Sequence, residues 1–176
     1  MRRTTAIALL LIAILCLSGC TSLSEQNAEV QEAALRLGEA YSKQGDYQNA
    51  LATYEKALES VTSKELLYNR ALMLAALQRW EEADIAAADA QKLYPASLVF
   101  STARISFFKA QGLQDKAIEV SYQILELDPC FEAVAVDLLA MLQSQQRQEE
   151  ARALARTMIS RGIGVDKAKA VLLNNL

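Results

Sequence analysis

Cysteine and histidine supply many of the nucleophiles and metal ligands in proteins. The chain has three cysteines, Cys16, Cys20 and Cys130, and no histidine. The commonest general base and the commonest metal ligand are therefore both missing. The sequence also lacks a phosphate-binding loop and a nucleophile elbow. We therefore expect a protein that is not an enzyme and that holds no metal and no cofactor.

Cys20 ends an N-terminal segment of the secretory type. Arg2 and Arg3 precede an unbroken apolar run over residues 6–17. This run is shorter than the roughly 20 residues that cross a bilayer, but it is typical of a signal peptide. It leads into Leu17-Ser18-Gly19-Cys20, which resembles the lipobox of bacterial lipoproteins. The resemblance implies that a signal peptide, residues 1–19, is removed, and that Cys20 carries a diacylglyceryl group and an amide-linked acyl chain such as palmitate.

Such a modification would anchor the protein to a membrane, because two or three acyl chains bind stably where one binds marginally. Residues 20–27 would form a short lipidated tether. Thr21 follows the cysteine in place of Asp, which by the same resemblance favours the outer membrane, with the protein facing the periplasm. In an organism without an outer membrane, the outer face of the cytoplasmic membrane is expected instead. The alternatives are an ordinary signal peptide with a chance cysteine, or an uncleaved membrane anchor.

The remainder of the chain has an internal period of about 34 residues. Four alanines mark it, Ala50, Ala83, Ala117 and Ala151, and each follows a short polar stretch. The composition favours helices, because Ala, Leu, Glu, Gln, Lys and Arg dominate while there are only two prolines and six glycines. The period therefore predicts repeated pairs of helices joined by short turns.

The first repeat, residues 31–63, resembles the tetratricopeptide repeat (TPR). The residues that carry this resemblance are Leu37, Gly38, Tyr41, Gly45, Tyr47, Ala50, Tyr54 and Ala57. Further repeats are assigned to residues 64–97, 98–131 and 132–163, and a capping helix to residues 164–176. The resemblance implies an all-α domain over residues 28–176, a right-handed α-solenoid of about four helix hairpins plus the C-terminal helix. A plain helical bundle with accidental periodicity is the alternative.

Particular residues predict details of these hairpins. Gly38 is expected to meet Ala50, because two small residues let the helices of one hairpin approach. Ile105 and Leu139 occupy the place of Gly38 in the third and fourth repeats, where they are expected to push the helices apart. Pro95 and Pro129 are expected to end helices, because the residue before a proline avoids the helical conformation.

The first helices of TPR hairpins line a concave face, which would bind a helix or an extended segment of another protein. The residues predicted to contact a partner are Leu35, Glu39, Ser42, Tyr68, Asn69, Leu72, Thr102, Ser106, Lys109, Val136, Ala140 and Gln143. The apolar members of this set could pack against neighbouring repeats instead. Some TPR proteins grip a C-terminal carboxylate with a clamp of cations, but two of the clamp positions here hold Leu35 and Glu39. We therefore do not expect that function.

Three further residues allow two interpretations each. Arg70 and Arg104 occupy the same place in adjacent repeats, where they could form a basic ladder for an acidic partner. We favour pairing of each arginine with an acid of the chain while its stem packs on apolar surface. Cys130 could be a reactive thiol, but no histidine is present to activate it, and we expect a buried small apolar residue.

The net charge of −3 and the lack of a basic stripe argue against nucleic acid as a partner. The lipobox and the repeats together predict a lipid-anchored adaptor or assembly factor that binds protein partners in the cell envelope. An accessory regulator of cell-wall enzymes is the first alternative. A small-ligand binder or enzyme is the second.

Overall fold

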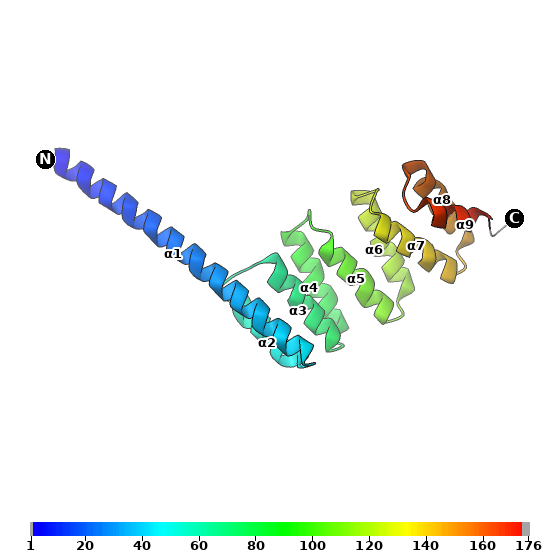
Figure 1. Cartoon of the computed structure of the whole chain (residues 1–176), viewed down its shortest axis with the longest axis horizontal. Helices are drawn as coiled ribbons and strands as arrows, with labels where there is room; N and C mark the ends of the chain where they lie inside the picture. The colour runs from blue at the N-terminus through cyan, green and yellow to red at the C-terminus, as the bar shows by residue number, and fades with distance from the viewer. Residues whose placement is uncertain (1, 174–176) are drawn as a thin grey trace. The chain divides into compact units, whose positions relative to one another are not determined.

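The computed structural model describes the backbone of residues 2–173 and the side chains of residues 23–173. Throughout this range the regular elements are α-helices joined by short turns, in the order shown in Figure 1. Their bounds are α1 Arg2–Lys43, α2 Tyr47–Leu58, α3 Lys64–Ala76, α4 Trp80–Leu93, α5 Val99–Ala110, α6 Gln114–Leu127, α7 Glu132–Ser144, α8 Gln148–Arg161 and α9 Val165–Leu173. The predicted all-α solenoid class is confirmed. The chain forms two compact units, Met1–Leu77 and Gln78–Leu176.

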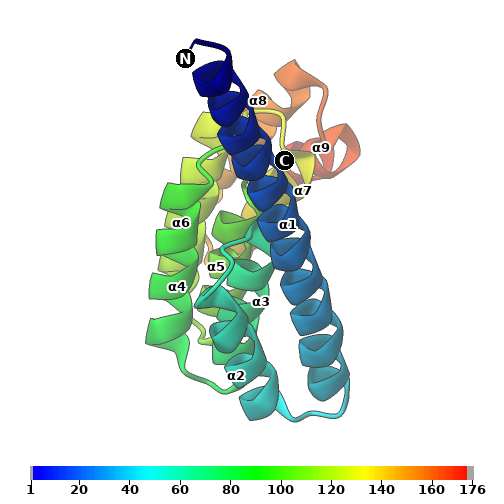
Figure 2. The same cartoon turned by 90° about the vertical axis from the view of Figure 1, so that its left-hand side faces the viewer.

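In the first unit, α1 and α2 run antiparallel beside each other, and α3 packs against both (Figure 2). The turn between α1 and α2 contains Gly45 with a φ of 77°, a conformation that glycine adopts without steric cost. Asp46 then caps α2, because its side chain accepts a hydrogen bond of 3.2 Å from the backbone N–H of Asn49. Leu51, Tyr54, Leu66 and Leu74 are the large side chains fully buried in this unit.

Gly38 was expected to meet Ala50, but the atoms nearest to its side-chain position belong to Tyr54. Tyr54, one turn after Ala50 in α2, places its ring against the backbone of Gly38. The Tyr54 side chain is 1 % exposed, and Ala50 is fully buried. Gly38 therefore makes room for an aromatic ring within its own hairpin, whereas the sequence pattern had matched it with a methyl group.

The second unit has one continuous apolar cluster that involves α5, α6, α7, α8 and α9. As predicted, Pro95 and Pro129 follow directly after the capping residues of α4 and α6. Ile105 and Leu139 are both buried in this cluster, while α5 packs against α6 and α7 against α8. These large side chains thus fill the core, and the prediction that they hold their helices apart finds no support.

The capping helix expected over residues 164–176 appears as α9. It packs on α7 and α8 and buries Ala168 and Val171. Residues 174–176 of the predicted helix lie outside the described residues.

At the other end of the chain, α1 continues without a break from Arg2 to Lys43. Residues 20–27, expected as a tether, are therefore helical in this chain and lie in the same helix as the first repeat. The side chains of the predicted signal peptide and of Cys20 lie outside the described side chains, so cleavage and lipidation stay predictions. In the described part of the chain, no helix combines the length and the apolar character needed to cross a membrane.

Candidate functional site

The partner-binding residues predicted in the first unit are all at least partly accessible. Leu35, Ser42, Tyr68, Asn69 and Leu72 are half-buried and Glu39 is exposed. The Glu39 carboxylate pairs with the Lys43 ammonium at 2.6 Å, and this hydrogen bond and the lysine charge lower the pKa of Glu39. The Asn69 amide donates to the Glu65 carbonyl at 2.9 Å. Two polar members of the set thus have partners within their own helices.

The members in the second unit have similar surroundings. Thr102 and Val136 are half-buried, and Ser106, Lys109, Ala140 and Gln143 are exposed. The Lys109 ammonium contacts the Asp137 carboxylate at 2.6 Å, which joins α5 to α7. The Thr102 hydroxyl donates to the Val99 carbonyl at 2.9 Å. That the twelve residues form one binding surface stays a prediction.

The two arginines at equivalent repeat positions pair with acids of the chain, as favoured above. Arg70 lies 3.2 Å from Glu55, and Arg104 lies 2.5 Å from Asp84. The Arg104 guanidinium also lies over the Phe108 ring, 5.8 Å from its centroid. Such a cation–ring contact adds to the ion pair. A free basic ladder at these two positions is thereby excluded.

The prediction that Cys130 is buried is wrong, because its side chain is exposed. Pro129 follows the end of α6, and the chain then turns before α7 begins at Glu132. The backbone N–H of Cys130 donates to the Asp128 carboxylate at 3.1 Å, which fixes the turn. A residue in such a connecting turn lies on the surface whatever its apolar character.

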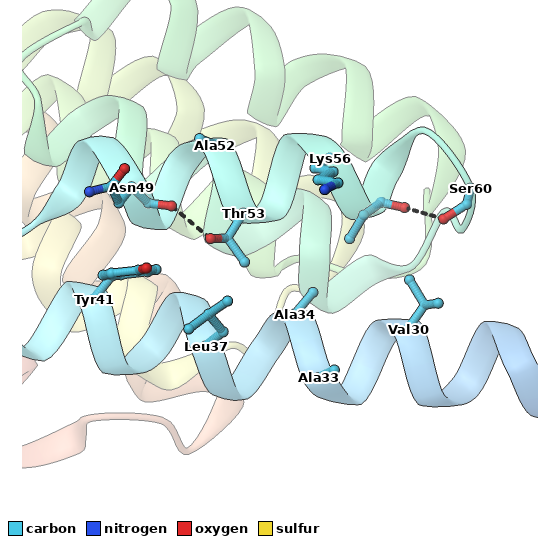
Figure 3. A pocket seen from close by; sticks show the side chains of 11 residues that line it. Val30, Ala33, Ala34, Leu37, Tyr41, Asn49, Ala52, Thr53, Lys56 and Ser60 are labelled. Carbon is cyan, nitrogen blue, oxygen red and sulfur yellow. Dashed lines mark hydrogen bonds between the residues drawn. The ribbon is translucent and has the colours of Figure 1, made fainter.

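An apolar groove that the sequence pattern did not reveal lies between α1 and α2 (Figure 3). Its volume is about 580 Å³. Figure 3 shows a row of side chains along α1 and further side chains along the neighbouring α2, of which Thr53 points toward α1. The lining residues are Val30, Ala33, Ala34, Leu37 and Tyr41 of α1, and Asn49, Ala52, Thr53, Lys56, Ala57 and Ser60 of α2 and its C-terminal turn.

The groove offers apolar surface and one charge. The Thr53 hydroxyl donates to the Asn49 carbonyl at 2.7 Å and the Ser60 hydroxyl donates to the Ala57 carbonyl at 3.1 Å, so backbone groups already occupy both hydroxyls (Figure 3). Leu37 is 49 % exposed although it is a large apolar residue. Lys56 is exposed, and within the described side chains it forms no ion pair. The groove can therefore bury an apolar helix face and pair with one acid.

A second cleft, of about 300 Å³, lies between α6 and α8 in the second unit. It is lined by Tyr122, Leu125 and Glu126 of α6, and by Glu150, Ala153, Leu154, Thr157 and Arg161 of α8. The Tyr122 hydroxyl hydrogen-bonds the Glu150 carboxylate, and burial, together with that carboxylate, raises the pKa of Tyr122. Arg147 donates to Glu150 at 2.7 Å and lowers the pKa of that carboxyl. Polar contacts thus hold α6 against α8.

The described residues contain no cluster of side chains that could hold a metal ion. What the arrangement offers is surface for binding, in grooves between helices.

Comparison with protein families finds a match in the first 97 residues of the chain. Residues 23–63 and 35–97 match the family described as tetratricopeptide repeat. Together these segments contain α1 from residue 23 onward, α2, α3 and α4. Comparison with curated proteins finds no match.

Solved structures with similar folds include several TPR proteins. A tetratricopeptide repeat protein from Parabacteroides merdae superposes with a TM-score of 0.65 at 15 % identity, covering 81 % of this chain and 57 % of that one. MamA gives a TM-score of 0.61 at 21 % identity, covering 78 % and 80 %. The second TPR domain of human RPAP3, solved with an HSP70 peptide, gives 0.55 at 20 % identity, covering 65 % and 97 %. The chain thus spans little more than half of the Parabacteroides protein, and at these identities the likeness is one of fold.

Proposed function

We propose that this chain, whose helices have the fold of tetratricopeptide repeats, is a lipid-anchored adaptor that holds a partner protein close to a membrane of the cell envelope. Proteins with this fold generally act as scaffolds for protein–protein interactions. The observation that carries the proposal is the open apolar groove between α1 and α2. Apolar surface that is left exposed and rimmed by polar residues marks interaction sites in soluble domains.

The sequence around Cys20 supports the anchored part of the proposal. Cys20 precedes Val30, the first groove residue on α1, by ten residues. At the rise of an α-helix, ten residues span about 15 Å. A lipid on Cys20 would therefore keep the near end of the groove, at Val30, within about 15 Å of the membrane surface, and a bound partner would be held close to the membrane as well. The outer membrane, with the protein facing the periplasm, is the proposed location because Thr21 follows the cysteine.

The mode of binding proposed here differs from that of a chaperone clamp. The RPAP3 domain was solved with an HSP70 peptide. In this chain the clamp positions Leu35 and Glu39 supply no cation, and Glu39 would repel a carboxylate. We therefore assign protein binding without a C-terminal carboxylate as its target.

Three measurements test the proposal. Intact-mass spectrometry of the membrane-extracted protein should show a chain that begins at a triacylated Cys20. The variant Cys20→Ser should leave the membrane fraction. Photo-crosslinkers placed at Tyr68 and Thr102 should then join the wild-type chain to another envelope protein and lose that product in Cys20→Ser. An unmodified Cys20, or the absence of any protein crosslink from either position, would contradict the anchored adaptor.

A further inference from the structure

The groove between α1 and α2 has a counterpart in the second unit. Each lining residue has an equivalent 101 residues later in the sequence, so that Leu37 corresponds to Leu138 and Lys56 to Thr157. On α1, the groove residues Val30, Ala33, Ala34, Leu37 and Tyr41 correspond to Phe131, Val134, Ala135, Leu138 and Leu142. On α2 and its C-terminal turn, Asn49, Ala52, Thr53, Lys56 and Ser60 correspond to Glu150, Ala153, Leu154, Thr157 and Arg161, which are the α8 residues of the second cleft. The two hairpins therefore present the same face.

In the second unit this face is covered by α6. Helix α6 packs on α7, and its Tyr122 and Leu125 line the cleft against α8. Leu138 and Leu142 are consequently fully buried. In the first unit no helix of that unit occupies the corresponding place, and Leu37, the equivalent of Leu138, stays 49 % exposed. The chain thus contains both an occupied and an unoccupied version of one helix-binding groove.

We propose that the α1–α2 groove binds one amphipathic α-helix of a partner protein, in the position that α6 takes on α7 and α8. This inference rests on the proposed function and specifies where the partner binds and with which kind of segment. The row from Val30 to Tyr41 contains twelve residues and is about 17 Å long, which matches roughly three turns of a bound helix. Amphipathic helices bind such grooves through apolar residues three and four positions apart.

Charge narrows the class of helix further. Glu126 of α6 lines the second cleft together with Thr157 and Arg161. At the place of Thr157 the first hairpin has Lys56, whose ammonium is exposed and pairs with no acid among the described side chains. A bound helix with an acid at the place of Glu126 would pair with Lys56. The expected partner helix therefore has large apolar side chains at the places of Tyr122 and Leu125, and an acid at the place of Glu126, directly after the second of them.

The chain itself provides a probe for this groove. The acetylated and amidated peptide of residues 114–127 has the sequence of α6 and contains the three residues just described. Labelled with a fluorophore, it is titrated against the full-length chain in lipid nanodiscs and followed by anisotropy. A free peptide of 14 residues is only partly helical, so modest affinity is expected. We expect saturable binding to one site.

Variants locate the site. Leu37→Glu, and as a second variant Ala33→Glu, should each weaken peptide binding about tenfold or more while leaving the thermal unfolding curve in place, since both residues are exposed. Ile85→Glu in α4 is the matched control, because Ile85 is 54 % exposed and Leu37 is 49 % exposed. It should not change the affinity. Lys56→Glu should weaken the wild-type peptide, and the peptide change Glu126→Lys should restore its binding to that variant.

Three results would overturn the inference. The first is no saturable peptide binding to the wild-type chain. The second is equal affinity of the wild type and both groove variants. The third is a wild-type dimer, seen in sedimentation, that Leu37→Glu converts to a monomer, because a second copy would then be the occupant. These results can be told apart from a failure of the proposed function. An unmodified Cys20 together with intact peptide binding would contradict the lipid anchor and support the partner groove. Crosslinks from Thr102 without peptide binding would support the adaptor and contradict the partner groove.

Discussion

The ring of Tyr54 lies against the backbone of Gly38, so that the two helices of the first hairpin meet across a glycine and an aromatic ring. A Cβ placed on Gly38 would lie 2.6 Å from the Tyr54 hydroxyl oxygen and closer still to two ring carbons. Tyr54 is 1 % exposed, so its ring is enclosed by neighbouring atoms. This contact holds α1 and α2 in the geometry that forms the groove beside them.

Gly38→Ala is therefore expected to destabilise the protein. Alanine in a helix is favoured over glycine by about 1 kcal/mol, but overpacking a core contact costs roughly 1–3 kcal/mol. Because the clashing atoms belong to a buried ring, we expect the cost to exceed the gain, with a net loss of up to about 2 kcal/mol in the free energy of unfolding by urea. The double variant with Tyr54→Leu should show a coupling energy, since the smaller side chain removes the clash. Additive effects of the two changes would contradict the contact.

Tyr54 also predicts a loss of stability in alkali. Burial raises the pKa of Tyr54 above its ordinary value of 10.0, and the nearby Glu39 charge adds to this. The raised pKa means that Tyr54 favours folding fully below about pH 10 and loses this contribution as the pH rises through the folded-state pKa. Thermal unfolding midpoints measured from about pH 9 upward should fall more steeply for the wild type than for Tyr54→Phe. Parallel curves for the two proteins would rule out the effect.

Gln146 lies in the turn between α7 and α8 with a φ of 59°, in the left-handed region. Glycine occupies the equivalent turn position at Gly45 and Gly112. A residue with a Cβ is less stable than glycine in this conformation by about 1 kcal/mol. Gln146→Gly should therefore raise the free energy of unfolding by up to about 1 kcal/mol. The neighbouring change Gln145→Gly, at a residue with a φ of −87°, should instead lower it. The same direction for both variants in urea unfolding would contradict this explanation.

The equivalent leucines of the two hairpins should respond very differently to a charge. Leu37→Glu changes an exposed side chain, so its effect on the free energy of unfolding should stay within about 0.5 kcal/mol. Leu138→Glu places a carboxylate in the fully buried position under α6 and should cost on the order of 4 kcal/mol or prevent folding. Urea unfolding of both variants checks this, and a comparable loss in both would mean that the face at Leu37 is also covered.

Much of the fold could be predicted from the repeat period. The spacing of the four alanines predicted alternating helices, and Pro95 and Pro129 follow the capping residues of α4 and α6 as expected. These predictions succeed because each depends on local properties, the helical preference of a segment or the restraint that a proline puts on its neighbour. The lipid on Cys20 and the concave binding face stay predictions.

Other features depend on three-dimensional packing that a repeat pattern does not contain. The pattern assigned a small position to Ile105 and Leu139, yet both fill one shared core. Cys130 is exposed because it lies in a turn, although cysteine as a residue type is often buried. The groove was missed for a similar reason. The pattern treats Leu37 and Leu138 as equivalent, and only the presence or absence of a covering helix distinguishes them.

The most direct test of the partner groove is amide hydrogen–deuterium exchange of the full-length chain with and without the α6 peptide. The account predicts slower exchange with peptide over residues 30–41 of α1 and 49–60 of α2 and its C-terminal turn, with little change elsewhere. Slower exchange over residues 132–161, where the peptide would be replacing the chain's own α6, or no change at any residue, would contradict it.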